Sequence, residues 1–230
     1  SSNARATPLG TVLVISPWNF PVAIPVGGVA ASLAAGNTVL LKPSPFAVPV
    51  AWEALRCFWE AGVSEDVLQL VSCENDEVAK ALAAHSGIDA VIFTGSTETG
   101  MRILQQNPAR RLFAETGGKN ATIVTAMADR DEAALDVVQS AFGHSGQKCS
   151  ATSLLVLEKE VHDDPGFKEQ LRDAVCSLKV GSPWKFESRV GPLTCPATEK
   201  LRSGTELEPS ESWLVPPELD ADGRWLTPAV

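Results

Sequence analysis

The feature that most restricts the fold is an alternation of short apolar runs with amphipathic segments, joined by short connections. The run 11–16 (Thr-Val-Leu-Val-Ile-Ser) is continuously β-branched or apolar, which is typical of a buried parallel strand. Alternating strands and helices predict an α/β fold, a parallel sheet with crossover helices. The predicted strands are 11–16, 38–42, 67–71, 90–93, 111–114, 121–124 and 153–157, and the predicted helices are 25–35, 49–61, 77–84, 97–106, 131–142 and 167–178.

Glycine and proline mark the ends of these segments. Gly36 and Gly62 follow two of the predicted helices, and glycine just past a helix is a common stop signal. From position 181 onward the chain contains seven prolines and loses its periodicity. That part is therefore predicted to form loops and edge strands.

Several residues with chemical functions stand where predicted strands end. Asn19, Lys42, Gly95 and Glu115 each follow or close a different strand. In open parallel sheets, binding sites form in the loops at the carboxyl ends of the strands. We therefore expect these residues to converge on one edge of the sheet.

Composition excludes several classes of partner. A net charge of −9 argues against nucleic acid or an anionic membrane as the main partner. Five cysteines without a CxxC pair suggest no disulfide framework, which favours a reducing, cytoplasmic setting. Only three histidines occur, none at ligand spacing, so no metal site is predicted. No apolar run reaches the length of a membrane span, and no signal peptide opens the chain.

Three short segments carry the parts of a covalent reaction at a carbonyl group. Cys149 lies in Gly-Gln-Lys-Cys-Ser-Ala, Glu115 opens Glu-Thr-Gly-Gly-Lys-Asn, and Asn19 lies in Pro-Trp-Asn-Phe-Pro. They supply a thiol nucleophile, a carboxylate that can act as a base, and an amide that can hold an oxyanion. Those groups suffice to attack a carbonyl and then to hydrolyse the resulting thioester.

Each of these residues also has an ordinary structural interpretation. A lone cysteine is usually a small buried hydrophobe, but the neighbours of Cys149 are polar or small and do not build an apolar core. Glu115 could be a carboxylate satisfied by backbone N–H groups at a strand end, although Gly117 and Gly118 favour close approach of a ligand. Asn19 alone could be a turn residue.

In their order, residue identities and spacing along the chain, the three segments resemble the aldehyde dehydrogenase superfamily. The resemblance runs over almost the whole chain, is densest from Pro8 to Ala151, and has its last good match at Val190-Gly191-Pro192-Leu193. Within the superfamily, Ser-Gly-Gln-Lys-Cys-Ser-Ala and Ala-Glu-Thr-Gly-Gly are most similar to glutamate-semialdehyde (1-pyrroline-5-carboxylate) dehydrogenases. They are especially similar to the dehydrogenase part of bifunctional proline-utilisation proteins.

The resemblance implies a role for each residue. Cys149 is the nucleophile that forms a thioester, and Glu115 is the general base that activates water to release the acid. Asn19 donates to the oxyanion together with the N–H of Cys149. Ser150 is expected to help bind the α-carboxylate of the substrate, with a hydroxyl that satisfies loop backbone as the alternative.

The same resemblance implies a nicotinamide cofactor, NAD or alternatively NADP. Phe93-Thr94-Gly95-Ser96-Thr97 is a strand that runs into a helix start, where a pyrophosphate is favoured. An ordinary capped turn has the same pattern. The cofactor residues implied are Ser16, Pro17, Trp18, Lys42, Ser44, Gly95, Ser96 and Gly117.

One departure from the family concerns the adenosine ribose. Many relatives carry glutamate three residues after the lysine, whereas this chain has Pro45. The ribose then lacks a bidentate acceptor, although Ser44 could partly substitute. Strict preference for NAD over NADP is therefore not expected.

A second departure is the stretch 72–76, which lacks the glycines many relatives carry, so no close dinucleotide approach is expected there.

The resemblance implies a Rossmann-like cofactor domain over 1–116 and an α/β catalytic domain over 117–230, both partial. It predicts oxidation of L-glutamate γ-semialdehyde to glutamate in proline catabolism by a homo-oligomeric enzyme. The alternatives are another aldehyde, such as succinic semialdehyde, or an inactive folded fragment. The chain is shorter than a whole family member and stops before the Glu-x-Phe-Gly-Pro motif, so an internal fragment with negligible activity of its own is expected.

Overall fold

The computed structural model describes residues 7–74 and 77–230. The expectation for the stretch 72–76 therefore falls partly outside the described residues, at 75 and 76. The chain divides into two units, Ser1–Gly117 and Gly118–Val230, which are described separately below. In the part of the chain that is described, no helix is both long and apolar enough to cross a membrane.

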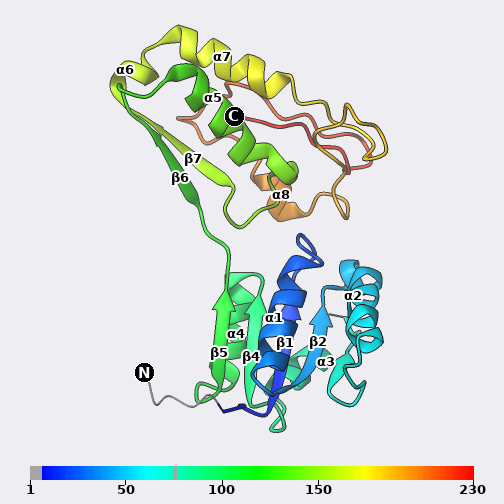
Figure 1. The fold of residues 1–230 in the computed structure, drawn as a ribbon. Coiled ribbons are helices and arrows are strands. Elements are labelled where there is room, and N and C mark those ends of the chain that lie inside the picture. Colours follow the sequence, from blue (N-terminus) through cyan, green and yellow to red (C-terminus); the bar gives the residue numbers. More distant parts are fainter. Residues whose placement is uncertain (1–6, 75–76) are drawn as a thin grey trace. The chain divides into compact units, whose positions relative to one another are not determined.

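The first unit is built on a five-stranded sheet (Figure 1). Its strands are β1 (Thr11–Ser16), β2 (Thr38–Pro43), β3 (Leu68–Leu70), β4 (Ala90–Thr94) and β5 (Arg111–Glu115). All neighbouring pairs are parallel, and the spatial order is β3-β2-β1-β4-β5. The parallel α/β fold predicted from the alternation is therefore confirmed. Because the chain moves outward first on one side of β1 and then on the other, the direction of winding switches between β1 and β4.

Helices cover both faces of this sheet, as Figure 1 shows. They are α1 (Ala23–Ala34), α2 (Val48–Glu60), α3 (Glu77–Ala84) and α4 (Thr97–Gln106), with a 3₁₀ turn, η1 (Pro45–Ala47), before α2. Val12 and Val14 of β1 pack with α1 and α2 in one core, while Leu13 packs with α3 and α4 in another. Alternate residues of one strand therefore serve both cores, which explains why the strand is continuously apolar.

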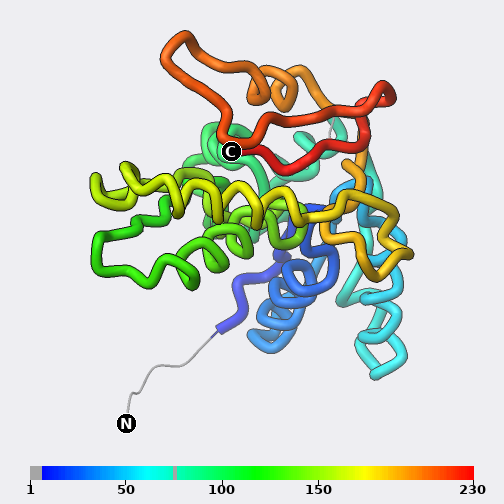
Figure 2. Tube along the Cα trace, turned by 90° about the horizontal axis from the view of Figure 1, so that it is seen from above, coloured from blue at the N-terminus to red at the C-terminus, as the bar shows by residue number. Residues whose placement is uncertain are grey.

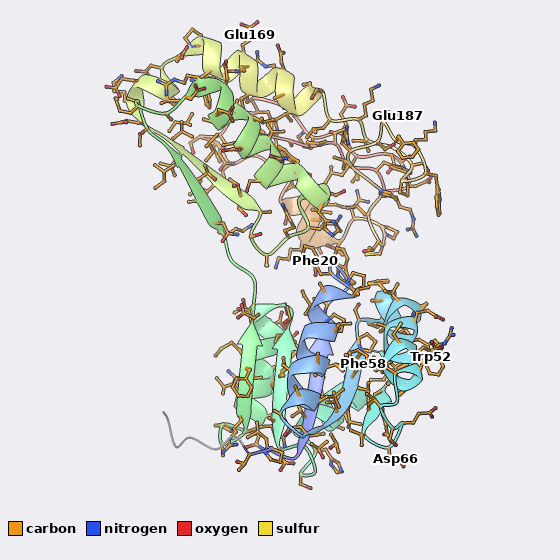
Figure 3. All side chains as sticks on the ribbon, viewed as in Figure 1. Phe20, Trp52, Phe58, Asp66, Glu169 and Glu187 are labelled. Atoms are coloured by element: carbon orange, nitrogen blue, oxygen red, sulfur yellow. The ribbon has the colours of Figure 1, made fainter. Side chains whose placement is uncertain are left out.

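Two helix ends follow the glycine signals of the sequence. Gly36 has a φ of 83° and Gly62 a φ of 99°, just beyond the C-caps of α1 and α2. Only glycine adopts this left-handed conformation without a steric cost. On α2, the ring of Phe58 packs against the core and Trp52 is exposed; Figure 3 labels both.

The second unit contains a two-stranded parallel sheet, β6 (Asn120–Val124) with β7 (Thr152–Leu157). Its helices are α5 (Arg130–Phe142), α6 (Lys159–His162), α7 (Pro165–Cys176) and α8 (Glu199–Ser203), with a 3₁₀ turn, η2 (Gly143–Gly146), after α5. Figures 1 and 2 show α5 and α7 side by side, and their apolar residues, among them Val137, Val138, Phe167 and Leu171, share one core.

The elements differ from the prediction in two places. The short helices α6 and α8 were not predicted from the sequence, because four or five residues are too few to show helical periodicity. Val161 is the one buried residue of α6, and its side chain packs fully into the core of the unit. Beyond Gly181 the chain forms loops with isolated bridges, at Val180–Val190 and Leu219–Leu226, in place of edge strands.

Candidate active site

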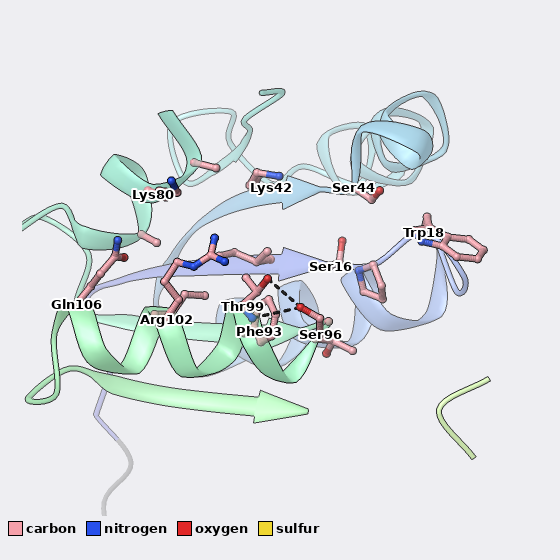
Figure 4. A pocket seen from close by; sticks show the side chains of 17 residues that line it. Ser16, Trp18, Lys42, Ser44, Lys80, Phe93, Ser96, Thr99, Arg102 and Gln106 are labelled. Carbon is pink, nitrogen blue, oxygen red and sulfur yellow. Dashed lines mark hydrogen bonds between the residues drawn. The ribbon is translucent and has the colours of Figure 1, made fainter. Parts of the chain in front are cut away.

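A pocket of about 290 Å³ lies in the first unit at the carboxyl ends of β1, β2 and β4 (Figure 4). It therefore spans the point where the winding of the sheet reverses, which is where open parallel sheets bind ligands. One face of α4 also lines this pocket. Its lining residues are Ile15, Ser16, Pro17, Trp18, Lys42, Ser44, Ala79, Lys80, Ala83, Phe93, Thr94, Gly95, Ser96, Thr99, Arg102, Ile103 and Gln106.

The charge of this pocket is positive. Lys42, Lys80 and Arg102 line it, and none of its described lining residues is acidic. Lys80 forms an ion pair with Glu77, and Arg102 pairs with Glu98 at 2.6 Å; the two glutamates are exposed and do not line the pocket. A pocket with cations and no lining carboxylate favours a ligand that carries phosphate groups.

Lys42 is the most unusual of these cations because it is only 2% exposed. It lies near the end of β2, and its amine donates to the carbonyl oxygen of Pro43 at 3.4 Å. Burying an ammonium group is unfavourable unless polar partners surround it. Lys42 thus places a buried cation at the wall of the pocket, where it would attract the phosphate oxygens of a ligand.

Ser16 closes β1 and provides a second indication of a polar ligand. Its hydroxyl is buried, and it is the one buried side-chain polar atom without a hydrogen-bond partner among the residues that the structure describes. Buried polar atoms are nearly always satisfied, so an orphaned hydroxyl at the wall of a pocket points to a missing polar partner. The site therefore fits a ligand that carries hydroxyl or phosphate oxygens.

The turn from β4 into α4 contributes the start of a helix to the pocket. The Ser96 hydroxyl caps α4 by accepting from the N–H of Thr99 at 3.2 Å and donates to the Thr99 hydroxyl at 2.9 Å (Figure 4). The capped turn weighed from the sequence is thus present, and it leaves the helix N-terminus at the pocket. A Cβ on Gly95 would lie 2.6 Å from the Phe93 ring, so this glycine is required by the chain's own packing.

Seven of the residues that the family resemblance implied for the cofactor line this one pocket, namely Ser16, Pro17, Trp18, Lys42, Ser44, Gly95 and Ser96. Gly117 is exposed and is not among the lining residues. Sequence reasoning missed Lys80 and also the stripe of Thr99, Arg102 and Gln106. The three- and four-residue spacing along α4 could have indicated that stripe, since such residues share a helix face.

Asn19 and Glu115 also belong to the first unit. Asn19 follows β1 and is half-buried before α1. Glu115 is the last residue of β5, its side chain is exposed, and its carbonyl oxygen accepts from the N–H of Gly95 at 3.1 Å. The carboxylate of Glu115 is therefore accessible to solvent at a strand end, as a water-activating base requires.

Cys149 lies in the second unit on a tight turn between η2 and β7. The turn spans Lys148 to Ala151 and is closed by a hydrogen bond from the N–H of Ala151 to the carbonyl oxygen of Lys148 at 3.1 Å. The thiol of Cys149 and the hydroxyl of Ser150 occupy its two central positions, and both residues are exposed. An exposed thiol on a fixed turn is accessible for nucleophilic attack.

The backbone before Cys149 is held in an unusual conformation. His144 and Ser145 have φ values of 58° and 55°, and Gly146 continues the left-handed run at 69°. Among the described residues, these two are the only non-glycine ones with positive φ. Such conformations cost energy and occur preferentially at functional sites.

The catalytic candidates are thus divided between the units, with Asn19 and Glu115 in the first and Cys149 and Ser150 in the second. Within the described residues, no group of three or more histidine, cysteine, aspartate or glutamate side chains is arranged to hold a metal ion.

Comparison with known proteins gives a consistent result. The model of the aldehyde dehydrogenase family matches residues 1–229. The bifunctional protein PutA of Klebsiella aerogenes is 41% identical over 200 residues, which cover 83% of this chain and 15% of that protein. The 1-pyrroline-5-carboxylate dehydrogenase of Bacillus mycoides is 36% identical over 237 residues, covering 94% of this chain and 46% of the relative.

A solved structure agrees with these relatives. Proline utilization A (PutA) from Corynebacterium freiburgense superposes with a TM-score of 0.90 at 47% identity, over 97% of this chain and 23% of that chain. The chain thus spans less than half the length of each of these relatives.

Proposed function

The chain belongs to the aldehyde dehydrogenase family, and from that premise we propose that it oxidises L-glutamate γ-semialdehyde to glutamate with NAD or NADP. The observation that carries the proposal is the exposed Cys149 thiol, fixed on a tight turn within a chain of this family. The names of its relatives support the substrate, since two of those reported above are a 1-pyrroline-5-carboxylate dehydrogenase and a bifunctional PutA. Pyrroline-5-carboxylate is the cyclised form of glutamate semialdehyde.

In the proposed reaction, the Cys149 thiolate adds to the aldehyde carbon and forms a thiohemiacetal. The oxygen of the former carbonyl becomes an oxyanion, which the N–H of Cys149 and the side-chain amide of Asn19 stabilise. A nicotinamide cofactor, when bound, would supply the acceptor for the hydride that leaves this carbon. The product of that step is a thioester on the sulfur of Cys149.

Glu115 serves in the second half of the reaction. Its carboxylate takes a proton from water as the water oxygen attacks the thioester carbon. The carbon–sulfur bond then breaks, the acid leaves, and the thiolate of Cys149 is regenerated. Support for this role comes from the exposed position of Glu115 at the end of β5.

The first unit is proposed to bind the cofactor in the positive pocket. The orphaned hydroxyl of Ser16, the buried amine of Lys42 and the N-terminus of α4 would hold its ribose and pyrophosphate oxygens. Gly117, outside the pocket, is proposed to let the backbone approach the nicotinamide end closely. The absence of a lining carboxylate is consistent with acceptance of both NAD and NADP.

Ser150 is proposed to bind the α-carboxylate of the substrate, which would favour glutamate semialdehyde over aldehydes without that group. The remaining features follow the family. We propose a cytoplasmic homo-oligomer with a cofactor domain over 1–116 and a catalytic domain over 117–230. The five free cysteines support a reducing compartment.

The test uses the natural polypeptide that contains these 230 residues. It is incubated with NAD or NADP and with glutamate semialdehyde, succinic semialdehyde or an aliphatic aldehyde. NADH absorbance is followed, and acid-quenched samples are digested to find the acyl adduct by mass spectrometry. We expect turnover on the order of 1–10 per second with glutamate semialdehyde, and an adduct of that aldehyde on Cys149.

Two controls complete the experiment. Cys149→Ala is expected to abolish both the NADH signal and the adduct, while Cys176→Ala, which removes another exposed thiol, should leave both unchanged. Faster turnover with succinic semialdehyde would transfer the proposal to that substrate, and an adduct on another cysteine would refute the assignment of the nucleophile.

A further inference from the structure

The turn that carries Cys149 is tied to a residue far from it in sequence. The side-chain amide nitrogen of Asn120 donates to the carbonyl oxygen of Cys149 at 2.7 Å and to that of Ala151 at 3.0 Å. One amide group has two N–H donors, so each can serve one carbonyl. Because both partners can only accept, the nitrogen and not the oxygen of the amide must face the turn.

Strand pairing explains why a side chain takes this role. Asn120 is the first residue of β6 and is aligned with Thr152, the first residue of β7, and the register shifts immediately afterwards. The ladder between the strands therefore ends at Thr152. The carbonyl groups of Cys149 and Ala151 lie beyond it, and the amide of Asn120 continues the hydrogen bonding that the backbone no longer provides.

The base of the turn is fixed as well. The hydroxyl of Thr152 lies 2.8 Å from that of Thr122 on β6 and donates to the hydroxyl of Ser140 on α5 at 2.8 Å. Side-chain hydroxyls thus join β7 to both neighbouring elements directly after the turn. Asn120 consequently connects the turn to a rigid support rather than to a mobile loop.

Asn120 acts on the central peptide of the turn. In a four-residue turn, the peptide between the two central residues is the one that can rotate while the ends stay in place. Here that peptide joins Cys149 to Ser150, and its carbonyl is the one Asn120 holds at 2.7 Å. Rotation of this peptide would change ψ of Cys149 and φ of Ser150, and would turn the Cys149 carbonyl and the Ser150 N–H together, so the turn would lose its present conformation.

We propose that Asn120 is a positioning residue for the nucleophile: by holding the Cys149 and Ala151 carbonyls it keeps the whole turn in one conformation, and thereby keeps the thiol and the N–H of Cys149 in the arrangement that a developing oxyanion needs. The inference rests on the proposed role of Cys149 and deepens it. Asn120 itself touches no reacting atom. Its loss should impair reactions that create an oxyanion and should spare reactions of the thiol that create none.

Two reactions of the same sulfur separate these effects. A 4-nitrophenyl ester acylates a thiol through an oxyanion and releases a coloured phenolate, whereas iodoacetamide alkylates the sulfur directly without one. Both rates are measured for Cys149 in the natural polypeptide that contains these 230 residues, with Cys149→Ala as the blank. For Asn120→Ala we expect acylation to fall about tenfold and alkylation to change less than about twofold.

Three further variants separate donation from shape. Asn120→Asp keeps the size of the side chain but removes the N–H donors, so its acylation should be as slow as that of Asn120→Ala. Asn120→Gln keeps the donors on a longer side chain and should recover part of the rate. Gln139→Ala removes an exposed amide from α5 and should match the unchanged protein.

Hydrogen exchange of each variant reports where the structure has loosened. We expect faster exchange confined to residues 147–153. Normal acylation in Asn120→Asp, or an equal fall in acylation and alkylation in Asn120→Ala, would overturn the proposal. It is also rejected if all three Asn120 variants lose the native exchange pattern, because Asn120 would then be a folding residue.

The outcome is independent of the substrate assignment. If the unchanged protein acylates Cys149 with the ester but oxidises none of the aldehydes, the proposed function fails and the comparison of variants still decides the role of Asn120. If the protein oxidises glutamate semialdehyde and Asn120→Ala acylates normally, only the positioning role is lost.

Discussion

The hydroxyl oxygen of Ser145 accepts a hydrogen bond from the backbone N–H of Gly191 at 3.1 Å, across 46 positions of sequence. Ser145 lies in the left-handed run before the nucleophile, with a φ of 55°. Gly191 lies in the segment Val190-Gly191-Pro192-Leu193, within the part of the chain that the family model matches. The hydrogen bond shows how that distant segment helps to hold a strained conformation next to Cys149.

Two substitutions at Ser145 separate the hydrogen bond from the strain. Ser145→Ala loses the acceptor for Gly191 and keeps a Cβ at positive φ, so it should destabilise the second unit by about 1 kcal/mol. Ser145→Gly loses the same hydrogen bond but removes the left-handed cost of about 1 kcal/mol. It should therefore be more stable than Ser145→Ala by about that amount.

Urea unfolding of the 230-residue chain, followed separately in the two units by hydrogen exchange, measures both effects. Ser153→Ala, at an exposed position of β7, is the control and should change neither unit. Equal stability of the alanine and glycine variants would mean that the backbone conformation at position 145 carries no strain.

Acid should weaken the C-terminal turn around Asp220. Its carboxylate accepts from the N–H groups of Trp225 at 2.8 Å and Arg224 at 2.7 Å, and these hydrogen bonds lower the pKa of Asp220 below its ordinary value. A carboxyl group whose pKa is lower when folded stabilises the fold above its unfolded pKa of about 3.9. That contribution is lost as the pH falls through the lower, folded pKa.

Asp220→Asn removes this titration. We expect the variant to be less stable than the original chain at pH 7 and to lose less stability as the pH falls below the unfolded pKa of about 3.9. Thermal unfolding at a series of pH values measures the difference. Parallel curves for the two proteins would show that Asp220 does not contribute to the acid dependence.

Glu115→Gln should separate the two halves of the proposed reaction. Acylation of Cys149 does not need the base, so the variant is expected to release one equivalent of NADH in a burst. Its steady-state rate should then fall by about 10²–10⁴, the usual contribution of a general base. Rapid mixing with NADH detection measures both phases, and Glu160→Gln, on the exposed helix α6, is the matched control. An unchanged steady-state rate would remove Glu115 from the mechanism.

Pro45→Glu tests the cofactor preference. Pro45 opens η1 directly after Ser44, and no acidic residue lines the described pocket. The original protein should therefore prefer NAD over NADP by a factor of ~10 at most, or about 1.4 kcal/mol. A carboxylate at position 45 should bind the ribose hydroxyls and repel a 2′-phosphate, which increases the ratio of the two affinities measured by calorimetry.

Pro45→Gln supplies the same length without the charge and should leave the ratio nearly unchanged. The idea fails if the original protein already rejects NADP by several orders of magnitude.

Local patterns were sufficient to predict the elements of the first unit. The apolar run 11–16 became β1, and the glycines at 36 and 62 adopt the left-handed conformation expected after a helix. Such signals are readable because periodicity and stop residues act within a few positions of each other. The short helix α6 escaped prediction, since its place depends on burial of Val161 in a core built by distant residues.

For the candidate site, the sequence by itself determined the reactive groups, because a thiol, a carboxylate and an amide are defined by residue type alone. Only the tertiary structure decided what surrounds them. Lys80 of α3 lines the same pocket as Lys42 of β2, and no short pattern indicates that. Asn120 reaches the carbonyl of Cys149 across 29 positions, because the ladder between β6 and β7 ends one residue beyond the turn. Such contacts depend on strand register and packing, which are properties of the whole chain rather than of any segment.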